Sequence, residues 1–217
     1  MLEYLVFDLD ETLYPRGSGL MQAISERISD YMIGRLGMDP AVVPGLRRQY
    51  WQEYGTTSRG LQLLHQIDVD DYMRYVHDVP LWCYIQPDPA LDAALSSCAQ
   101  RKVVFTNATT EHAQAVLRIL GVTHHFEAIY DALFFGNEVK PAAGAYRRLL
   151  QTLGVEGRQC LLVEDSARNL RPARALGMIT VLVDPPVDGD VDGADHIIQH
   201  VAEIAEVVNR LDAPTEG

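Results

Sequence analysis

The chain has 217 residues, of which 47% are hydrophobic and 22% charged, and this balance is typical of an ordinary soluble globular protein. Its formal net charge of −12 argues against nucleic acid as a partner, because phosphate backbones attract basic surfaces. No segment approaches the roughly 20 apolar residues that a membrane span requires. We therefore expect a cytoplasmic protein that binds neither nucleic acid nor membranes.

The first predicted element is a short buried strand at residues 2–7, followed closely by two carboxylates, Asp8 and Asp10. Side chains two residues apart in an extended chain point the same way, so both carboxylates can face one small volume. Like charges that close repel each other, and the pair is costly unless a cation, a proton or a reaction uses it. This cost marks the pair as a candidate functional position.

The stretch between residues 15 and 85 differs from the rest of the chain, because it contains helical patterns and no convincing strand. Helices are expected at residues 19–36, 40–54, 58–66 and 70–76. About 70 residues of this kind between two sheet strands are too many for one connection in a compact layer. We therefore predict a helical cap domain at residues 15–85, inserted into a core domain made of residues 1–14 and 86–217.

Beyond residue 100, short apolar strands alternate with helices that stop at glycine. Strands are predicted at residues 102–105, 160–163 and 179–183, and helices at about 109–120, at about 142–153 and up to residue 176. This alternation indicates a parallel sheet that is covered on both faces by helices. Together with the first strand, the sheet has at least four strands.

The three cysteines, Cys83, Cys98 and Cys160, have no metal-ligand spacing and cannot all pair in disulfides. We expect them to be small buried residues in a reducing compartment. The seven histidines, which include the adjacent His124 and His125, likewise show no spacing that predicts a metal site.

Polar residues interrupt the apolar pattern at four places, each directly after a predicted strand or before a helix. They are Asp8 and Asp10, Thr106 and Asn107, Lys140, and Glu164 and Asp165. All strand carboxyl ends of a parallel sheet lie on one edge, so these groups can converge there. Together they provide what phosphoryl transfer needs: a carboxylate nucleophile, a second carboxylate for proton transfer, oxygen ligands for magnesium, and a hydroxyl and an ammonium for the phosphoryl oxygens.

Each place alone also has an ordinary structural interpretation. An isolated Asp-x-Asp is often a turn or a cap, and Thr106 and Asn107 can serve a strand end and a turn. Lys140 can be a solvated residue before Pro141, and Asp165 or Ser166 can cap the next helix. The occurrence of all four places in order favours the catalytic interpretation.

The ordered set resembles the motifs of the haloacid dehalogenase (HAD) superfamily, and the resemblance covers the whole chain. The matching segments are Asp8-x-Asp10-x-Thr12-Leu13, Thr106-Asn107, Lys140-Pro141 and Glu164-Asp165-Ser166. The resemblance implies an α/β fold with a Rossmann-like parallel sheet, helices on both faces and an inserted α-helical cap domain. It also implies a hydrolase that uses Mg²⁺.

The resemblance assigns catalytic roles by position. Asp8 resembles the nucleophile, which is also a magnesium ligand. Asp10 resembles the general acid/base, and its backbone carbonyl also binds the metal. Thr106 and Lys140 resemble the pair that binds the phosphoryl group. The aspartate at position 10 implies a phosphatase or phosphomutase, because the dehalogenases lack an aspartate there.

The remaining roles follow from the same resemblance. Asp165 resembles the acidic metal ligand, and Glu164 a second or outer-shell ligand. Asn107 is a candidate substrate-binding residue. Arg59 is another, because the segment from residue 54 to 61 and the Leu13-Tyr14-Pro15 sequence resemble pyrimidine 5′-nucleotidase-like members. Arg59 can pair with phosphate or stack on a base, or it can be a solvated residue between cap helices.

These resemblances imply a magnesium-dependent phosphomonoesterase that acts through an aspartyl phosphate. The expected partner is a small phosphorylated metabolite, a nucleoside 5′-monophosphate with a pyrimidine base preferred. A sugar-phosphate phosphomutase and a non-catalytic phosphometabolite-binding module are the alternatives. The oligomeric state is open between a monomer and a homodimer.

Overall fold

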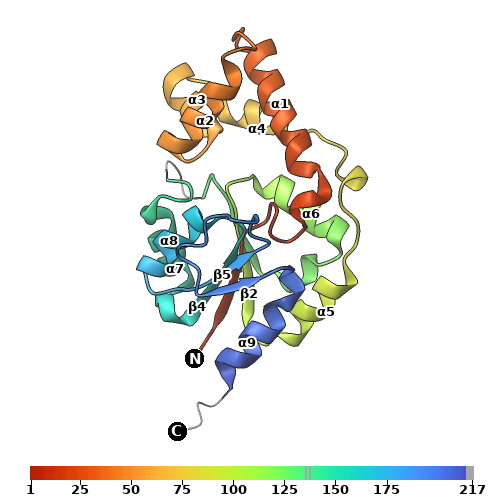
Figure 1. Cartoon of the computed structure of the whole chain (residues 1–217), viewed down its shortest axis with the longest axis vertical. Coiled ribbons are helices and arrows are strands. Elements are labelled where there is room, and N and C mark those ends of the chain that lie inside the picture. Colours follow the sequence, from red (N-terminus) through yellow and green to blue (C-terminus); the bar gives the residue numbers. More distant parts are fainter. Residues whose placement is uncertain (135, 137, 214–217) are drawn as a thin grey trace. The chain divides into compact units, whose positions relative to one another are not determined.

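The structure is a computed structural model that describes residues 1–134, 136 and 138–213. Within these residues the chain divides into two compact units, one made of Met1–Gly17 with the described residues from Ile85 onward and the other of Ser18–Tyr84. The first unit is an α/β structure and the second is helical (Figure 1). No helix in the described part of the chain is both long and apolar enough to cross a membrane.

The first unit is built around a sheet that has six strands within the described residues, all paired in parallel. The strand order is β3-β2-β1-β4-β5-β6, which is the order of a Rossmann fold. The strands are β1 (Tyr4–Phe7), β2 (Arg101–Phe105), β3 (Ala128–Tyr130), β4 (Cys160–Glu164), β5 (Ile179–Val183) and β6 (His196–Ile198). The predicted parallel α/β fold is confirmed, and β3 and β6 extend the predicted sheet at its two edges.

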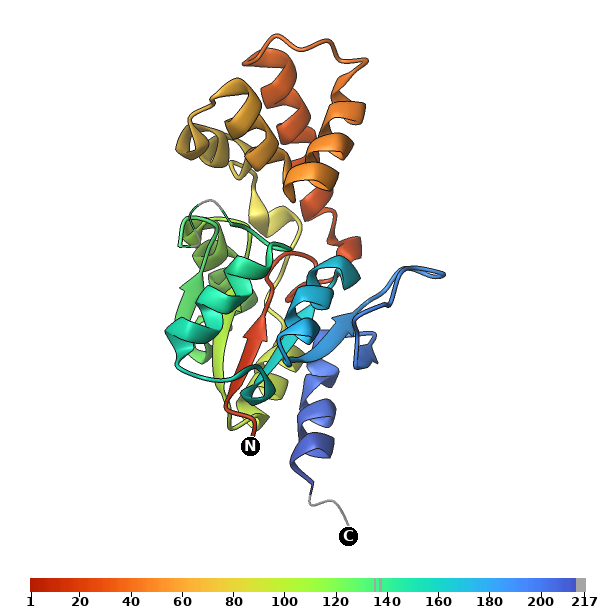
Figure 2. The same ribbon diagram turned by 90° about the vertical axis from the view of Figure 1, so that its left-hand side faces the viewer.

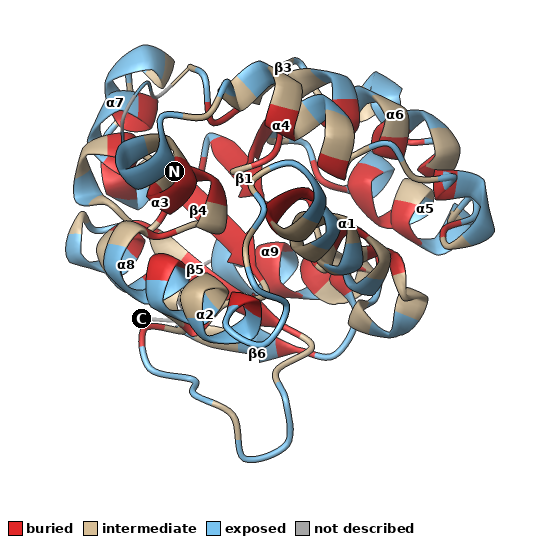
Figure 3. Ribbon diagram, turned by 90° about the horizontal axis from the view of Figure 1, so that it is seen from above, coloured by how far each residue is buried: buried red, intermediate tan, exposed pale blue. Residues whose placement is uncertain are grey.

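Helices cover both faces of this sheet, as Figures 1 and 2 show. One face carries α7 (Ala143–Leu153) and α8 (Ala167–Ala175), and the other carries α5 (Pro89–Ser97), α6 (Thr110–Leu120) and α9 (Ile204–Asp212). On the first face, Val6 and Phe105 of the strands share a buried cluster with Tyr146 of α7 and Leu170 of α8. Figure 3 shows the consequence, with buried strands between helices whose outer surfaces are exposed.

The second unit consists of α1 (Leu20–Gly34), α2 (Val43–Tyr54), α3 (Thr57–His65) and α4 (Val69–Val76). Its core contains the buried side chains of Tyr31, Tyr50 and Tyr72. Helix α2 approaches α3 closely at Gly60, where a Cβ atom would lie 2.5 Å from the Cβ and Cγ atoms of Tyr50. The contact between these two helices therefore depends on a residue without a side chain.

The strand order reverses at β1, and the carboxyl end of β1 is therefore the topological switch point of the sheet. Phe7 at this end is paired with Val104 of β2 and with Val163 of β4. Open α/β sheets bind their ligands in the crevice at such a point. The residues that directly follow β1, β2 and β4 consequently meet at one place.

The prediction that all cysteines are buried is wrong for Cys83. Cys98 and Cys160 are buried, whereas Cys83 is exposed. Cys83 ends a single 3₁₀ turn, Leu81–Cys83, in which Leu81 is the buried residue. Only one side of a single turn at the surface can face the core. Leu81 takes that side, and the thiol of Cys83 lies on the other.

Candidate active site

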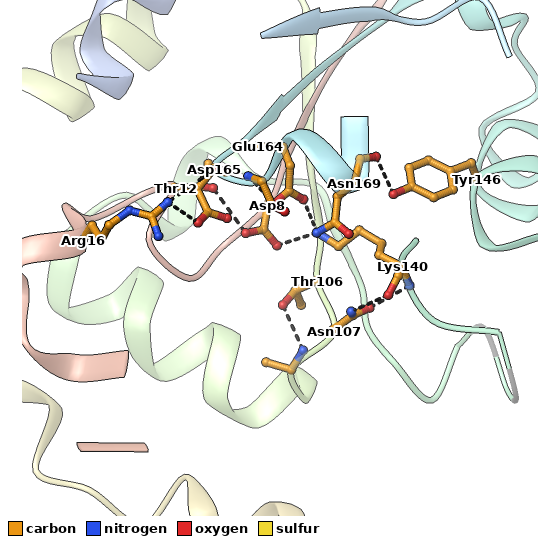
Figure 4. A network of polar contacts seen from close by, with 12 residues as sticks. Asp8, Thr12, Arg16, Thr106, Asn107, Lys140, Tyr146, Glu164, Asp165 and Asn169 are labelled. Atoms are coloured by element: carbon orange, nitrogen blue, oxygen red, sulfur yellow. Dashed lines mark hydrogen bonds and ion pairs between the residues drawn. The ribbon is translucent and has the colours of Figure 1, made fainter. Parts of the chain in front are cut away.

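The carboxylates of Asp8, Glu164 and Asp165 come together at the carboxyl edge of the sheet (Figure 4). Asp8 directly follows β1, Glu164 is the last residue of β4, and Asp165 comes next. One oxygen from each carboxylate lies within 4.8 Å of the others. The backbone N–H of Asp8 donates to the carbonyl of Val163 at 2.9 Å, so the hydrogen-bonding ladder between β1 and β4 extends up to the site.

Lys140 lies between two of these carboxylates. Its Nζ atom is 2.6 Å from Oδ1 of Asp8 and 2.7 Å from Oε2 of Glu164. The Lys140 side chain is only 1% exposed, and this excludes the interpretation of a solvated lysine before Pro141. The ammonium partly compensates the negative charge that the carboxylates bring into a buried place.

Burial shifts the ionisation of this cluster. Burial and the charge of Glu164 raise the pKa of Asp8 above its ordinary value, although Lys140 opposes the shift. Burial likewise raises the pKa of Glu164 to about 7, and burial with the charge of Asp8 raises the pKa of Asp165 to about 6. Burial acts to lower the pKa of Lys140, but Asp8 and Glu164 outweigh it and raise that pKa. Burial, together with repulsion between neighbouring carboxylates, therefore disfavours the charged form of all three carboxylates.

The donor set fits Mg²⁺. Asp8, Glu164 and Asp165 offer carboxylate oxygens within 4.8 Å of one another, and Mg²⁺ is a hard cation that takes one or two carboxylates and keeps several waters. Burial is the main cause of the raised carboxylate pKa values and repulsion between the carboxylates adds to it, and a divalent cation would relieve that repulsion. The predicted ligands Asp8, Glu164 and Asp165 are thus gathered, whereas the metal contact of the Asp10 carbonyl stays a prediction.

Asp10 directs its carboxylate to two buried side chains. The hydroxyl of Tyr14 donates to Asp10 Oδ1 at 2.7 Å, and Nε2 of His112 lies 3.0 Å from the same oxygen. Burial and the charge of Asp10 raise the pKa of Tyr14 well above its ordinary value, so its phenol stays protonated and acts as the donor. Tyr14 lies on the loop after β1 and His112 in the first turn of α6.

Thr106 and Asn107 follow β2 at the same edge of the sheet. Thr106 is buried, and its hydroxyl accepts a hydrogen bond from the N–H of Ala108 at 3.0 Å. The Asn107 carboxamide donates to the Lys140 carbonyl and accepts from the Lys140 N–H, both at 2.9 Å. Asn107 thus holds the backbone of Lys140 in place. A contact between Asn107 and the substrate stays a prediction.

Arg16 forms ion pairs with two acidic residues near the cluster. Its guanidinium lies 2.7 Å from Oδ2 of Asp165 and 3.0 Å from Oε2 of Glu11. It also donates to the backbone carbonyl of Asp165 at 3.2 Å. These contacts fix the side chain of Asp165 next to Asp8 (Figure 4).

Arg59 lies in the helical unit, in the first turn of α3. Its N–H donates to the hydroxyl of Thr56, which caps the helix, and its guanidinium donates to Gln62. Its predicted contact with a phosphate or a base stays a prediction.

Comparison with known proteins places the chain in a family. Residues 2–177 match the family of haloacid dehalogenase-like hydrolases, which is most of the chain. The chain belongs to this family. The expected membership in the haloacid dehalogenase superfamily is therefore confirmed, and the pyrimidine 5′-nucleotidase-like subgroup stays a proposal.

Curated relatives of this haloacid dehalogenase-like chain include named phosphatases. Phosphate metabolism protein 8 of Saccharomyces cerevisiae is 28% identical over 79% of this chain and 58% of that protein. Fructose-1-phosphate phosphatase YqaB of Escherichia coli is 33% identical over 45% of this chain and 52% of that protein. Phosphoglycolate phosphatase of Neisseria gonorrhoeae is 27% identical over 83% of this chain and 79% of that protein. The matches thus span little more than half the length of the first two relatives.

Solved structures share the haloacid dehalogenase-like fold. CbbY from Rhodobacter sphaeroides in complex with phosphate is 21% identical with a TM-score of 0.67, covering 94% of this chain and 96% of that one. L-2-haloacid dehalogenase from Xanthobacter autotrophicus is 16% identical with a TM-score of 0.62, covering 96% and 99%. Because a dehalogenase and a protein solved in complex with phosphate share this fold, the fold alone does not determine the reaction.

Sequence reasoning did not select Tyr14, Arg16 or His112 for the haloacid dehalogenase-like site. Tyr14 lies four residues after Asp10, and Arg16 follows a proline and begins a single 3₁₀ turn, Arg16–Ser18. His112 is 102 residues away from Asp10. His112 could have been predicted from its position in α6, because this helix directly follows Thr106 and Asn107 and starts at the catalytic edge of the sheet.

Proposed function

We propose that this chain is a magnesium-dependent phosphomonoesterase that works through an aspartyl phosphate on Asp8. The observation that carries the proposal is the buried ammonium of Lys140, 2.6 Å from Asp8 and 2.7 Å from Glu164. It offsets the charge of a carboxylate nucleophile and can bind a phosphoryl oxygen as an anionic substrate arrives. The named phosphatases among the relatives support this reaction class.

In the first step, a carboxylate oxygen of Asp8 attacks the phosphorus atom and the bond from phosphorus to the ester oxygen breaks. The carboxylic acid of Asp10 gives its proton to the departing oxygen. Lys140 and the hydroxyl of Thr106 bind the phosphoryl oxygens while their charge redistributes. Asp8 and Asp165 would hold a magnesium ion here, and the bound ion would supply further positive charge at the phosphoryl group.

In the second step, the carboxylate of Asp10 takes a proton from a water molecule. The water oxygen attacks the phosphorus atom, the bond between phosphorus and Asp8 breaks, and inorganic phosphate is released. Asp10 thereby regains the proton that it gave away, and Asp8 regains its free carboxylate. One residue serves as acid and then as base, and its contacts with Tyr14 and His112 hold one carboxyl oxygen of Asp10 in a fixed place.

The covalent mechanism is tested with substitutions at the two aspartates. Asp8→Asn should abolish phosphate release, because its amide is a far poorer nucleophile, and the fold should survive. Asp10→Asn should slow the breakdown of the phosphoenzyme, which can be trapped with ³²P-labelled substrate. Full activity in the Asp8→Asn variant would overturn the covalent mechanism.

For the substrate we propose nucleoside 5′-monophosphates, with a pyrimidine base preferred. The resemblance of residues 54–61 and of Leu13-Tyr14-Pro15 to pyrimidine 5′-nucleotidase-like proteins supports this class. The guanidinium of Arg59 in that segment suits a phosphate or a planar base. Sugar phosphates are an equally supported second candidate, because fructose-1-phosphate phosphatase is among the relatives. A sugar-phosphate phosphomutase remains the alternative reaction.

A phosphate-release screen over nucleoside monophosphates, sugar phosphates and small phosphate esters separates these classes. It is run with Mg²⁺ and with EDTA. A higher kcat/KM for pyrimidine monophosphates supports nucleoside 5′-monophosphates as the substrate class. In that case Arg59→Ala should raise KM. Arg48 is exposed, and the control variant Arg48→Ala should leave KM unchanged. A preference for sugar phosphates supports the second. Isomerised sugar phosphate without free phosphate would identify a phosphomutase.

A further inference from the structure

A second group of metal-ligating side chains lies apart from the catalytic carboxylates. Asp92 is in the first turn of α5, and His124 and His125 are in a 3₁₀ turn, Thr123–His125. One ligand atom from each of them lies within 4.8 Å of the others. The 3₁₀ turn joins the end of α6 to the start of β3, so this group belongs to the amino edge of the parallel sheet, opposite the edge that carries Asp8.

Each of the two imidazoles directs its Nε2 atom at the same carboxylate oxygen of Asp92. Nε2 of His125 lies 2.8 Å from Oδ1 of Asp92, and Nε2 of His124 lies 3.3 Å from that same atom. The planes of the two rings are inclined by 39°, and their centroids are 4.0 Å apart. The His125 side chain is 9% exposed, whereas those of His124 and Asp92 are 65% and 45% exposed. The group is therefore anchored on its inner side and open to solvent on its outer side.

These distances are close to those around a bound metal ion. Zinc bonds to imidazole nitrogen and carboxylate oxygen are about 2.0–2.2 Å long, which puts neighbouring ligand atoms about 3.3 Å apart in a tetrahedral site. The two measured nitrogen–oxygen distances, 2.8 and 3.3 Å, approach this value. Small rotations of exposed side chains are enough to admit an ion, because two of the three groups face solvent.

The charges of the group also favour a cation. Two imidazolium rings at this separation would repel each other, and one carboxylate would have to offset both. Neutral imidazoles that carry their proton on Nδ1 can instead direct both Nε2 lone pairs at one metal ion. Asp92 then supplies a negative charge to the ion.

We propose that Asp92, His124 and His125 bind a transition-metal ion of the zinc type, at a site separate from the magnesium cluster. Imidazole nitrogen suits zinc, copper and nickel, whereas carboxylate and water suit magnesium. The two clusters therefore take different metals. The three side chains leave a fourth position for water or another ligand. The bound ion links α5 to the turn before β3 and stabilises that part of the α/β unit.

The test uses the whole chain without a polyhistidine tag and in a Cys83→Ser background. The exposed Cys83 is removed because a thiolate competes strongly for zinc. Zinc is titrated calorimetrically in excess Mg²⁺, and Co²⁺ is used as a spectroscopic probe because its visible spectrum distinguishes nitrogen-bearing four-coordinate sites from oxygen-only ones. We expect one zinc ion per chain and a higher unfolding temperature in its presence.

His124→Ala and His125→Ala should each weaken zinc binding at least about tenfold and remove the Co²⁺ spectrum of the nitrogen-bearing site. His124 is the decisive variant, because its side chain is largely exposed and its loss leaves the fold intact. His200→Ala is the matched control, since His200 is a partly exposed histidine whose Nε2 lies 3.8 Å from Asp88 at the start of the same helix α5.

The outcomes are decisive in both directions. Zinc binding that survives in His124→Ala, or that is lost in His200→Ala instead, overturns the proposed ligands. Zinc binding that is lost in Asp165→Asn and unchanged in His124→Ala would assign the ion to the catalytic cluster and also overturn the proposal. The result does not depend on phosphatase activity, so failure of the proposed function and failure of this site are separate findings.

Discussion

Nε2 of His112 lies 3.0 Å from Oδ1 of Asp10, although 102 positions separate the two residues in the chain. Tyr14 donates to the same oxygen at 2.7 Å. Two contacts on one oxygen restrict rotation of the carboxyl group. Proton transfer depends on that orientation, so His112 is a positioning residue for the proposed acid and base.

Replacing His112 should affect substrates unequally. His112→Ala should lower kcat by about 10- to 100-fold for a nucleoside monophosphate or sugar phosphate, whose leaving oxygen needs a proton. The loss should be smaller for p-nitrophenyl phosphate, because p-nitrophenolate departs without one. Steady-state kinetics with both kinds of substrate measure the difference.

His112→Gln, which keeps a donor, should recover part of the activity that His112→Ala loses. In an Asp10→Asn background, His112→Ala should have little further effect, because there is no acid left to orient. Equal losses for both kinds of substrate would show that His112 acts on the fold in general.

Lys140→Met should destabilise the metal-free protein by about 3–5 kcal/mol, because removing one partner of a buried ion pair leaves the other charge uncompensated. Urea unfolding in EDTA at pH 8 measures the free energy of unfolding. Lys102→Met is the matched control, since Lys102 is also buried but donates to the backbone carbonyls of Cys98 and Gln100. An equal loss in both variants would show that burial of the lysine stem, and not the carboxylates, sets the effect.

Gly60→Ala should destabilise the helical unit by about 1–3 kcal/mol, because the added methyl overlaps the side chain of Tyr50. Gly45→Ala in α2 should instead stabilise the protein by about 0.5–1 kcal/mol, since its Cβ meets nothing within 4 Å and alanine favours a helix. Thermal unfolding followed by circular dichroism compares the two. The same sign for both variants would contradict the close contact between α2 and α3.

The thiols should react in two classes. Cys83 is exposed, so a thiol reagent should label it in the native protein. Burial raises the pKa of the Cys160 thiol to about 12 and also raises the pKa of Cys98, and the reactive thiolate is therefore scarce at both. A pH of 9 is still below the pKa of Cys160. Raising the pH from 7 to 9 should therefore not make Cys160 reactive. Mass spectrometry of the labelled protein, before and after unfolding in urea, counts the thiols.

The strands β1, β2, β4 and β5 were predictable because each is a short apolar run, which a strand buried on both faces requires. The polar residues at the ends of β1, β2 and β4 were predictable as a cluster, because parallel strands end at one edge of the sheet. The edge strands β3 and β6 have three residues each, too few to form a pattern. The exposure of Cys83 was also beyond prediction, because a single turn has no periodicity.

Local pattern was therefore sufficient for the parallel α/β fold, since the strands and the helices between them depend on which side of each element is apolar. The choice of partners was decided only in three dimensions. Lys140 lies between Asp8 and Glu164, and Asn107 holds its backbone. His124 and His125, which show no metal spacing along the chain, meet Asp92 from another helix. The physical reason is that hydrogen bonds and ion pairs act over about 3 Å, and only the folded path of the chain brings distant residues within that range.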